Sequence, residues 1–260
     1  MKGRIVFLYS ELAGYVLSCI EALAQQDDVA VAHWPVHPEA PFTLPTDAPF
    51  ALRDRSGMDA EALAAWVEEQ GPRALVVSGW MDRDYVAVAR KWRDRIPVVL
   101  TLDNPWTGSW RQRAAVWSAP WFVRRVYNRI WYAGAPQRPF AGRLGLQPAA
   151  EGWYCADVDA FDEAFQRRAP ERRLLYVGRY LPFKGVDELW EAFVSLADRF
   201  PDWELHAVGA GAGWEDRVEH GQIVHHGFLQ PDELAPLVAT AAAFVMPSHR
   251  EPWGVVLHEM

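Results

Sequence analysis

Residues 174–190 read LLYVGRYLPFKGVDELW, which combines a short apolar run, a turn with two glycines and the start of an amphipathic helix. The run Arg173–Val177 is rich in Leu, Val and Tyr and predicts a strand. Val186–Phe200 has apolar residues near helical spacing and predicts a helix. A strand followed at once by a helix is the repeating unit of a parallel sheet, so this stretch indicates an α/β fold.

The same alternation extends over the whole chain of 260 residues. In its first part we expect strands at Arg4–Tyr9, Val29–Trp34, Ala74–Ser78, Pro97–Leu102 and Asn128–Tyr132, with helices at Tyr15–Gln26, Met58–Gln70, Asp82–Arg93 and Arg111–Tyr127. In its second part we expect two further strands, Trp203–Val208 and Ala243–Met246, and a helix at Pro231–Thr240. The charged stretch Asp162–Arg173 is interpreted as a linker. The pattern predicts two α/β domains, 1–165 and 166–260. Because few residues follow Pro252, either the second domain is incomplete or something else covers its sheet.

The composition restricts the class of protein. Half of the residues are hydrophobic and 23% are charged, so the chain can form a buried core. A net charge of −8 argues against a surface built for nucleic acid. The longest apolar stretch has about 13 residues, whereas a membrane span needs about 20. Two cysteines without metal-ligand spacing and an N-terminus that runs directly into a strand favour a cytoplasmic protein with no metal site.

The turn after the strand at 173–177 has the features of an anion site. It reads Gly178-Arg179-x4-Lys184-Gly185 and lies directly before a predicted helix. Glycine lets the backbone approach a ligand, and Arg179 and Lys184 supply a guanidinium fork and an ammonium. The chain has 23 Arg but only three Lys, which favours a specific need for Lys184. We interpret the turn as a diphosphate cradle, and a plain turn with two solvated cations remains the alternative.

A second cluster of candidate residues lies near the end of the chain. Glu251 and Glu259 flank a Pro-Trp-Gly turn that includes Gly254 and begins a predicted helix. Two carboxylates on either side of a diphosphate could accept hydrogen bonds from a sugar and from a ribose. The alternative is that both are ordinary acids near a helix start, where they favour the helix dipole.

Three motifs together resemble a known family. They are the turn at 178–185, His226-Gly227-Phe228-Leu229 before Pro231, and Pro247-Ser248-x2-Glu251-Pro-x-Gly254-x4-Glu259. In this order and spacing they resemble the C-terminal half of retaining glycosyltransferases of family 4. The resemblance implies the GT-B architecture, with two Rossmann-like parallel-sheet domains of which the second is incomplete here. It also implies an acceptor-side first domain and a nucleotide-sugar-binding second domain.

The resemblance further implies an activity. A sugar would pass from a UDP- or GDP-linked donor to a glycan or a lipid-linked acceptor, with retention at the anomeric carbon and without a cofactor or obligatory metal. The implied roles are diphosphate binding by Arg179, Lys184 and Gly254, donor-sugar contact and catalysis by Glu251, ribose binding by Glu259, a second catalytic position at Asp103, and a donor-side loop at Gly14. The glycine-rich turn that begins at Gly209 is interpreted from its sequence as a further donor-side loop, and a plain loop is the alternative.

The sequence departs from the family pattern in its first part. Ala13 precedes Gly14 where the family has two adjacent glycines, and Asp103-Asn104 stands where the family commonly has a His. Two alternatives therefore stay open. The chain could be an inactive or nucleotide-binding fragment of such an enzyme, or a non-catalytic Rossmann-type nucleotide-binding module.

The distribution of charge points to one further surface. Residues 104–150 contain seven Arg and five Trp but no Asp or Glu, so this segment carries +7 in a chain of net −8. In the helix predicted at Arg111–Tyr127, Trp121 stands next to Arg124 and Arg125. This composition suits a phosphorylated acceptor or an anionic membrane surface, at the inner face of the membrane. The alternative is an ordinary amphipathic helix with its Trp residues in the core.

Overall fold

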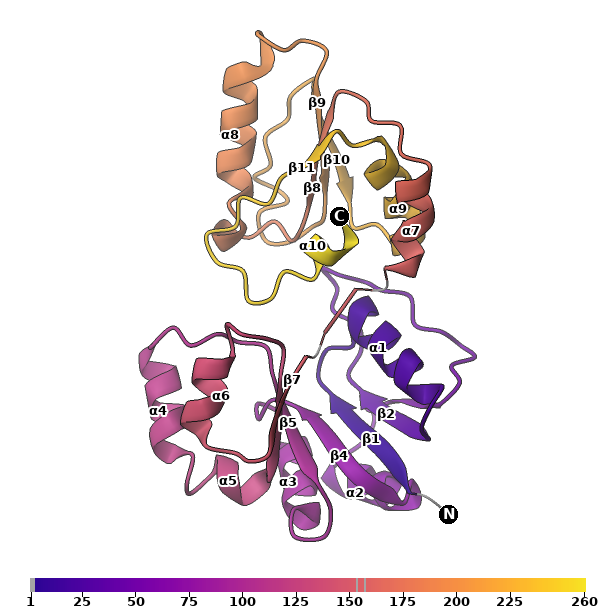
Figure 1. Cartoon of the computed structure of the whole chain (residues 1–260), viewed down its shortest axis with the longest axis vertical. Helices are drawn as coiled ribbons and strands as arrows, with labels where there is room; N and C mark the ends of the chain where they lie inside the picture. The colour runs from indigo at the N-terminus through magenta and orange to yellow at the C-terminus, as the bar shows by residue number, and fades with distance from the viewer. Residues whose placement is uncertain (1–2, 153, 157) are drawn as a thin grey trace. The chain divides into compact units, whose positions relative to one another are not determined.

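The computed structural model describes residues 3–260 except 153 and 157. The chain forms two compact units, which are described separately (Figure 1). The first contains residues up to Val36 and Leu44–Cys155, and the second contains His37–Thr43 and Ala156–Met260. The described part of the chain has no helix that is both long and apolar enough to cross a membrane.

The first unit is built on a seven-stranded parallel sheet with the order β3-β2-β1-β4-β5-β6-β7. Its strands are β1 (Arg4–Tyr9), β2 (Val29–His33), β3 (Ala51–Asp54), β4 (Pro72–Ser78), β5 (Val98–Leu102), β6 (Arg129–Tyr132) and β7 (Ala149–Glu151). The central strands are buried on both faces, which explains their nearly continuous apolar sequences. The strand order reverses direction between β1 and β4.

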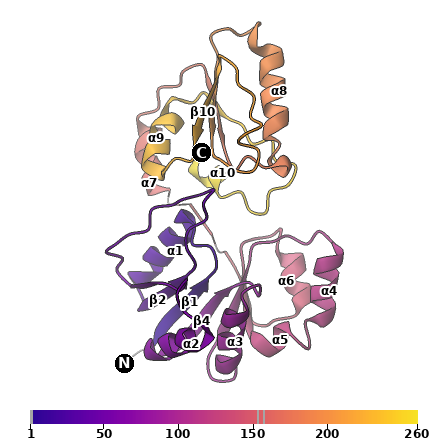
Figure 2. The same cartoon turned by 180° about the vertical axis from the view of Figure 1, so that it is seen from behind.

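Helices cover both faces of this sheet, as Figures 1 and 2 show. They are α1 (Gly14–Ala24), α2 (Ala60–Glu69), α3 (Arg83–Trp92), α4 (Trp110–Ser118), α5 (Val123–Val126) and α6 (Arg138–Leu144). Two of them begin at aspartates whose carboxylates accept backbone hydrogen bonds from the first turn, Asp59 before α2 and Asp82 before α3. These caps fix the starts of the two helices that pack with β1, β2 and β4 in one apolar core.

The second unit has a four-stranded parallel sheet with the order β10-β9-β8-β11. The strands are β8 (Arg173–Val177), β9 (Glu204–Val208), β10 (Ile223–Gly227) and β11 (Ala243–Phe244). On one face, α8 (Val186–Ala197) buries Trp190 and Phe193. On the other, α7 (Asp159–Gln166) and α9 (Pro231–Thr240) pack together (Figure 1). The 3-10 turn η1 (Pro182–Lys184) and the short α10 (Val256–Glu259) complete the unit.

The predicted α/β architecture with parallel sheets is confirmed, and two local predictions are wrong. The helix predicted at Arg111–Tyr127 is broken into α4 and α5. Pro120 lies in the break, and proline has no N–H to donate to a carbonyl of the preceding turn. The stretch Asp162–Arg173 is not wholly a linker, because α7 extends to Gln166 and buries Ala164. Residue 165, the predicted domain boundary, falls inside this helix.

Two strands of the first sheet were not predicted from the sequence. Strand β3 has only four residues, mostly exposed, and β7 has three exposed residues, so neither shows an apolar pattern. Both are the edge strands of the sheet, where fewer side chains contact the core.

A short segment from the first half of the sequence, His37–Thr43, belongs to the second unit. The ring of Phe42 meets that of Phe228 edge-on, with centroids 5.0 Å apart. The Gln230 side chain donates to the Pro41 carbonyl at 2.9 Å and accepts from the Thr43 amide at 3.3 Å. The backbone therefore passes between the two units three times.

Candidate functional site

The candidate donor site lies at the carboxyl ends of β8 and β11. The chain continues from β8 to β9 and β10 on one side, whereas β11 adds to the other side of β8. The order of strands thus reverses between β8 and β11. In open α/β sheets, ligands bind in the crevice outside the carboxyl ends of the strands at such a reversal. Two loops border this point, 178–185 after β8 and 245–255 after β11.

The two loops are joined by an ion pair between predicted site residues. Lys184 Nζ lies 2.6 Å from Glu251 Oε2, and the same oxygen accepts a hydrogen bond of 3.1 Å from the Ser248 hydroxyl. The Lys184 and Glu251 side chains are only 16% and 20% exposed. The His249 amide also donates to the Phe183 carbonyl at 3.0 Å. A cation and a carboxylate are thereby held together at the switch point of the sheet.

Gly185 allows this close approach of the loops. Its φ is +66°, and a Cβ atom built on it would lie 2.4 Å from the Pro247 carbonyl oxygen. A side chain would therefore strain the backbone and separate the loop of Lys184 from that of Glu251. The predicted need for glycine here has two causes, the left-handed conformation and the contact with Pro247.

Arg179 lies on the first of these loops, and Gly209 lies next to that loop. The Arg179 carbonyl accepts a hydrogen bond of 3.1 Å from the Tyr176 hydroxyl. Its guanidinium Nη1 lies 3.9 Å from Glu39 Oε2, and both side chains are substantially exposed. Gly209 has φ +134°, and a Cβ there would lie 2.0 Å from the Gly178 carbonyl oxygen. The turn after β9 therefore packs directly against the loop of Arg179. The donor-side role of Gly209 stays a prediction.

Gly254 and Glu259 follow in the second loop and in α10. Gly254 has φ +71°, and a Cβ there would lie 2.9 Å from Cγ of Glu251. Its backbone is therefore packed against the side chain of Glu251. Burial raises the pKa of the Glu259 carboxyl above its ordinary value of 4.5. A carboxyl in such surroundings favours a ligand that can donate hydrogen bonds to it.

Gly14 and Asp103 belong to the first unit, at the carboxyl edge of its sheet. Gly14 begins α1 shortly after β1, and Asp103 follows β5. Asp103 Oδ1 accepts a hydrogen bond of 2.8 Å from Asn104, and its main-chain carbonyl accepts one of 2.7 Å from Gln137. Burial, with a smaller contribution from the negative charge of Glu11, raises the pKa of the Asp103 carboxyl.

Sequence reasoning assigned no role to several residues that the structure places beside these positions. Ser248 hydrogen-bonds Glu251. Its position three residues before Glu251 in the same motif is a signal that the sequence contains. Glu39 gave no signal, because it lies far from Arg179 in the sequence. In the first unit, the Tyr9 hydroxyl lies 3.1 Å from that of Tyr154 and 3.3 Å from Thr101 Oγ1. These groups form a buried polar cluster near Asp103.

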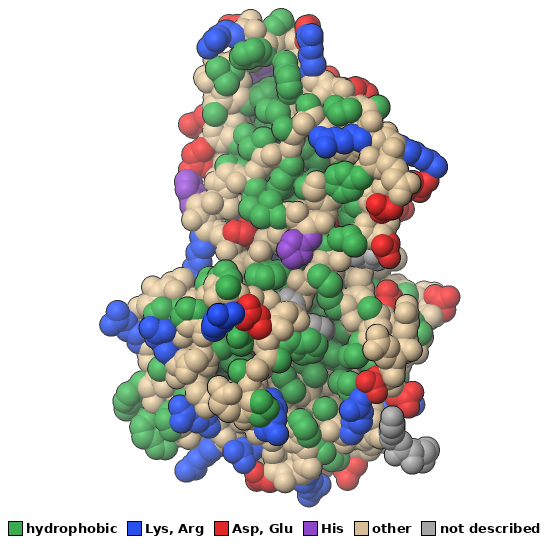
Figure 3. Space-filling model, viewed as in Figure 1, with side chains coloured by type: hydrophobic (Ala, Val, Ile, Leu, Met, Phe, Trp, Pro, Cys, Tyr) green, Lys and Arg blue, Asp and Glu red, His purple; other side chains and the backbone are tan. Residues whose placement is uncertain are grey.

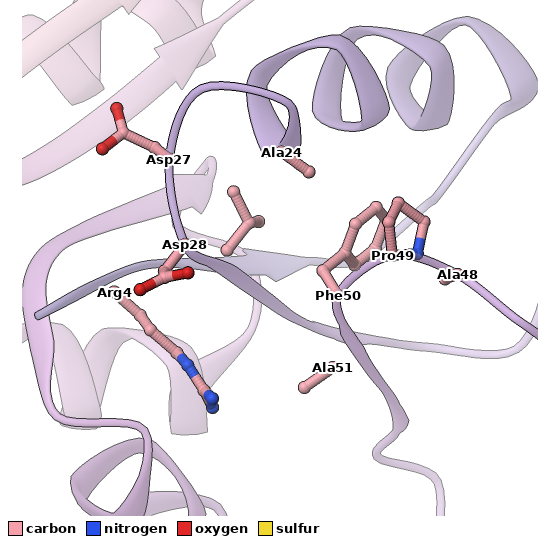
Figure 4. Close-up of a pocket in the computed structure, with 9 residues that line it drawn as sticks. Arg4, Ala24, Asp27, Asp28, Ala48, Pro49, Phe50 and Ala51 are labelled. Carbon is pink, nitrogen blue, oxygen red and sulfur yellow. The ribbon is translucent and has the colours of Figure 1, made fainter.

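A surface pocket of the first unit lies away from these residues (Figure 4). It is lined by Arg4, Val29 and Ala51, which begin β1, β2 and β3, together with residues of the loops before β2 and β3. These are the amino ends of the strands, the edge opposite to the one where open parallel sheets bind ligands. None of the predicted site residues lines it.

The predicted acceptor or membrane residues lie around the break between α4 and α5. Trp121 is 59% exposed, and Trp117 in the same region is 73% exposed. The interpretation that these tryptophans lie in the core is therefore wrong. Arg124 and Arg125 are exposed at the start of α5, and Arg124 Nε donates to the Leu144 carbonyl at 2.9 Å.

Comparison with known proteins agrees with this geometry. Residues 171–260 match the family described as Glycosyl transferases group 1. The chain is 36% identical over 94 residues to the sulfoquinovosyl transferase SQD2 of Arabidopsis thaliana. It is 33% identical over 112 residues to a glycogen synthase of Mycobacterium tuberculosis. These matches cover 35% and 39% of this chain but only 18% and 27% of the relatives.

Solved structures extend the likeness of fold to the whole chain. The Anabaena protein Alr3699/HepE, crystallised with UDP and glucose, matches with a TM-score of 0.67 at 16% identity. An α,α-trehalose-phosphate synthase (UDP-forming) from Burkholderia xenovorans matches with 0.65 at 13% identity. Each match covers 99% of this chain, and 77% and 82% of the other chain respectively. The predicted α/β fold of GT-B type is thereby confirmed.

Proposed function

We propose that this protein transfers a sugar from a nucleoside-diphosphate sugar, linked to UDP or GDP, to a glycan or a lipid-linked acceptor. The pairing of Lys184 with Glu251 at the switch point of the second sheet carries the proposal. This pair lies inside the segment that matches the Glycosyl transferases group 1 family. It places a cation for a diphosphate and a carboxylate for a sugar on two adjoining loops.

The residues suggest how the transfer would proceed. The bond between the anomeric carbon and the diphosphate oxygen would break, and negative charge would develop on the departing diphosphate. An acceptor hydroxyl oxygen would form the new bond to that carbon, and the hydroxyl proton would pass to the departing diphosphate. Lys184 and Arg179 would stabilise that charge, so that no metal ion is obligatory in this proposal. Glu251 would exchange its contact with Lys184 for hydroxyls of the donor sugar, and Gly254 would let the backbone of its loop come close to the diphosphate.

Two further carboxyls, one in each unit, have proposed roles. Glu259, whose burial raises its pKa, would accept hydrogen bonds from the ribose. Asp103, also with a raised pKa, would serve as a catalytic residue on the acceptor side, and Gly14 and Gly209 would form donor-side loops. We propose retention at the anomeric carbon, supported by the resemblance of the motif at 247–259. We also propose a reaction in the cytoplasm or at the inner face of the membrane, for which the positive charge of residues 104–150 is the support.

Donor turnover by the 260-residue chain tests the proposal. The chain is incubated with UDP- and GDP-sugars, with and without glycan or lipid-linked acceptors, and the released nucleotide is measured by chromatography. Lys184→Met and Glu251→Gln should reduce turnover by at least about 100-fold. Lys91→Met and Glu191→Gln, at exposed positions on α3 and α8, are matched controls and should retain activity. Proton NMR of the product reads the anomeric configuration.

Thermal shift measurements separate the alternatives. Stabilisation by UDP or GDP without turnover would indicate a nucleotide-binding fragment, and stabilisation by NAD alone would indicate a Rossmann-type binding module. Stabilisation by a nucleoside diphosphate that Lys184→Met abolishes, together with turnover, supports the transferase.

A further inference from the structure

Helix α4 presents an unusual surface in the first unit. None of its residues is buried. Trp110 and Trp117 on this helix are 74% and 73% exposed, and Trp121 just beyond it is 59% exposed. Figure 3 shows hydrophobic side chains projecting at the edge of the lower unit over α4, next to Lys and Arg side chains. Large apolar groups exposed in this way mark interaction surfaces.

The three tryptophans follow one another along the same side of the chain. Trp110 and Trp117 are seven residues apart, which places them on one face of α4 about two turns apart. The rings of Trp117 and Trp121 are in contact, with centroids 5.3 Å apart. Trp117 and Trp121 therefore form one apolar patch, and Trp110 lies on the same helical face as Trp117.

Arginines of α4 and of the neighbouring helices α5 and α6 accompany these tryptophans. Among the described residues, no carboxylate lies within ion-pair distance of Arg111, Arg113, Arg124, Arg125 or Arg143. Arg138, by contrast, is paired with Glu151. The Arg111 guanidinium lies over the Trp110 ring, 5.4 Å from its centroid. We call these five arginines with Trp110, Trp117 and Trp121 the Trp–Arg surface.

The chemistry of the Trp–Arg surface selects among possible partners. A neutral glycan could stack on indole rings but has no charge to meet the arginines. A second copy of the chain packed symmetrically would bring the same positive charges together. A bilayer with anionic lipids offers both complements, because indole rings favour the headgroup region and arginines favour lipid phosphates.

We propose that the Trp–Arg surface binds peripherally to a bilayer that contains anionic lipids. The indole rings of Trp110, Trp117 and Trp121 enter the headgroup region while the arginines contact the lipid phosphates. This membrane binding goes beyond sugar transfer and does not depend on it, because no residue of the candidate donor site takes part. It can therefore be measured in a variant such as Lys184→Met that lacks the proposed activity.

Vesicle flotation tests the proposal. The 260-residue chain is mixed with vesicles of phosphatidylcholine alone or with phosphatidylglycerol, at low and high salt. We expect binding only to the anionic vesicles, weakened by salt. Arg111→Glu with Arg125→Glu should weaken it at least about 25-fold, since each basic residue contributes about fivefold near an anionic surface. The same two positions changed to Lys should retain it.

The apolar part of the interaction is tested by Trp117→Ser with Trp121→Ser. This variant should bind at least about tenfold more weakly. The blue shift of tryptophan fluorescence expected on anionic vesicles in the unchanged protein should also diminish. Arg90→Glu with Lys91→Glu, an exposed pair on α3, and Phe200→Ala, at an exposed position of the second unit, are matched controls that should bind normally.

Several results would overturn the proposal. One is the absence of flotation with anionic vesicles at low salt, and another is equal binding to neutral vesicles. Binding unaffected by both charge reversal and Trp substitution would also exclude this surface. Self-association in sedimentation that the Trp variant abolishes, or binding to single-stranded RNA or a polysaccharide without binding to vesicles, would assign the surface to a different partner. The fluorescence readout needs no variant, so a variant that fails to fold leaves the proposal testable.

Discussion

The ammonium of Lys184 and the carboxylate of Glu251 meet at 2.6 Å, with most of each side chain shielded from water. Each charge offsets part of the cost of burying the other, so the loss of either charge alone would destabilise the two loops. A diphosphate and a sugar that bind here must replace that mutual contact with contacts of their own. The ion pair therefore links the stability of the loops to the affinity for a donor.

Removing one member of this pair should destabilise the fold. We expect Lys184→Met to lower the free energy of unfolding by about 2 kcal/mol, less than for a fully buried pair, because a partly buried carboxylate is left alone. Lys184→Met combined with Glu251→Leu should regain most of that stability without regaining donor turnover. Urea denaturation measures both. Arg172→Met, which breaks the exposed pair with Asp202, is the control and should change stability by less than about 0.5 kcal/mol. Equal losses of stability in Lys184→Met and Arg172→Met would contradict the prediction.

Gly185→Ala should destabilise the fold because of the local backbone geometry. The substitution places a side chain at φ +66° and 2.4 Å from the Pro247 carbonyl oxygen. We expect a loss of at least about 2 kcal/mol in the free energy of unfolding, and weaker binding of nucleoside diphosphate. Gly221→Ala is the matched control, since a Cβ there has no neighbour within 4 Å, and it should stay within about 0.5 kcal/mol. Denaturant titration compares the two, and a tolerated Gly185→Ala would show that the loops can separate.

Glu259 should make the stability of the protein depend on pH. Burial raises the pKa of its carboxyl above 4.5, so the folded chain holds this proton more tightly than the unfolded chain does. Stability from this group is present below the unfolded pKa and is lost as the pH rises through the folded pKa. Glu259→Gln should therefore gain stability relative to the unchanged protein as the pH rises from about 4 to about 7.

Thermal unfolding across that pH range measures the effect of Glu259→Gln. Glu191→Gln, at an exposed position of α8, provides the reference. The same Glu259→Gln variant should bind UDP or GDP more weakly but inorganic pyrophosphate unchanged, because only the nucleotides carry a ribose. A parallel loss of pyrophosphate binding would show that Glu259 acts on the loop rather than on the ribose.

Glu39 should compete with diphosphate for Arg179. The two side chains lie 3.9 Å apart and are exposed enough for water to screen them, so the competition is mild. We expect Glu39→Gln to tighten pyrophosphate and UDP binding by about two- to fivefold at low salt. Isothermal titration calorimetry gives the affinities, and Asp202→Asn is a control for loss of one surface charge. Unchanged affinity in Glu39→Gln would mean that Arg179 does not meet the diphosphate.

The two cysteines should differ in reactivity. Cys19 Sγ lies 3.5 Å from Cys155 Sγ, but only Cys155 is exposed. Burial raises the pKa of the Cys19 thiol to about 11, which leaves little thiolate at neutral pH. Iodoacetamide at about pH 8 should therefore modify Cys155 first, and Cys19 should react faster as the pH approaches 11. Peptide mass spectrometry of timed samples decides this, and equal rates at both positions would be inconsistent with a raised pKa of the Cys19 thiol.

Strands and helices that carry the core were predictable from the sequence because their apolar periodicity is strong. Strands β1, β5 and β8 agree with the predicted ranges to within one residue. The exposed edge strands β3 and β7 lack such a pattern. Pro120 is a signal for the break in the sequence, and the prediction of one continuous helix did not take it into account.

The site was predictable only as far as it is local in sequence. The glycine turn with Lys184 and the motif with Glu251 each stand within a short stretch, and the adjacency of β8 and β11 brings them together. The contact of Glu39 with Arg179 depends on a chain crossing that no local pattern specifies. The exposure of Trp117 and Trp121 depends on how the chain turns at Pro120, and composition alone left it open.

The segment His37–Thr43 affects how this protein could be recombined with its relatives. If residues 1–155 were exchanged for those of a relative, Pro41 and Phe42 would be replaced by residues that pack against the relative's own second half. Phe228 would lose its ring partner, and the Gln230 amide would lose both of its backbone contacts. Functional chimeras would therefore need to carry 37–43 along with the second half, although more than a hundred residues separate the two in the sequence.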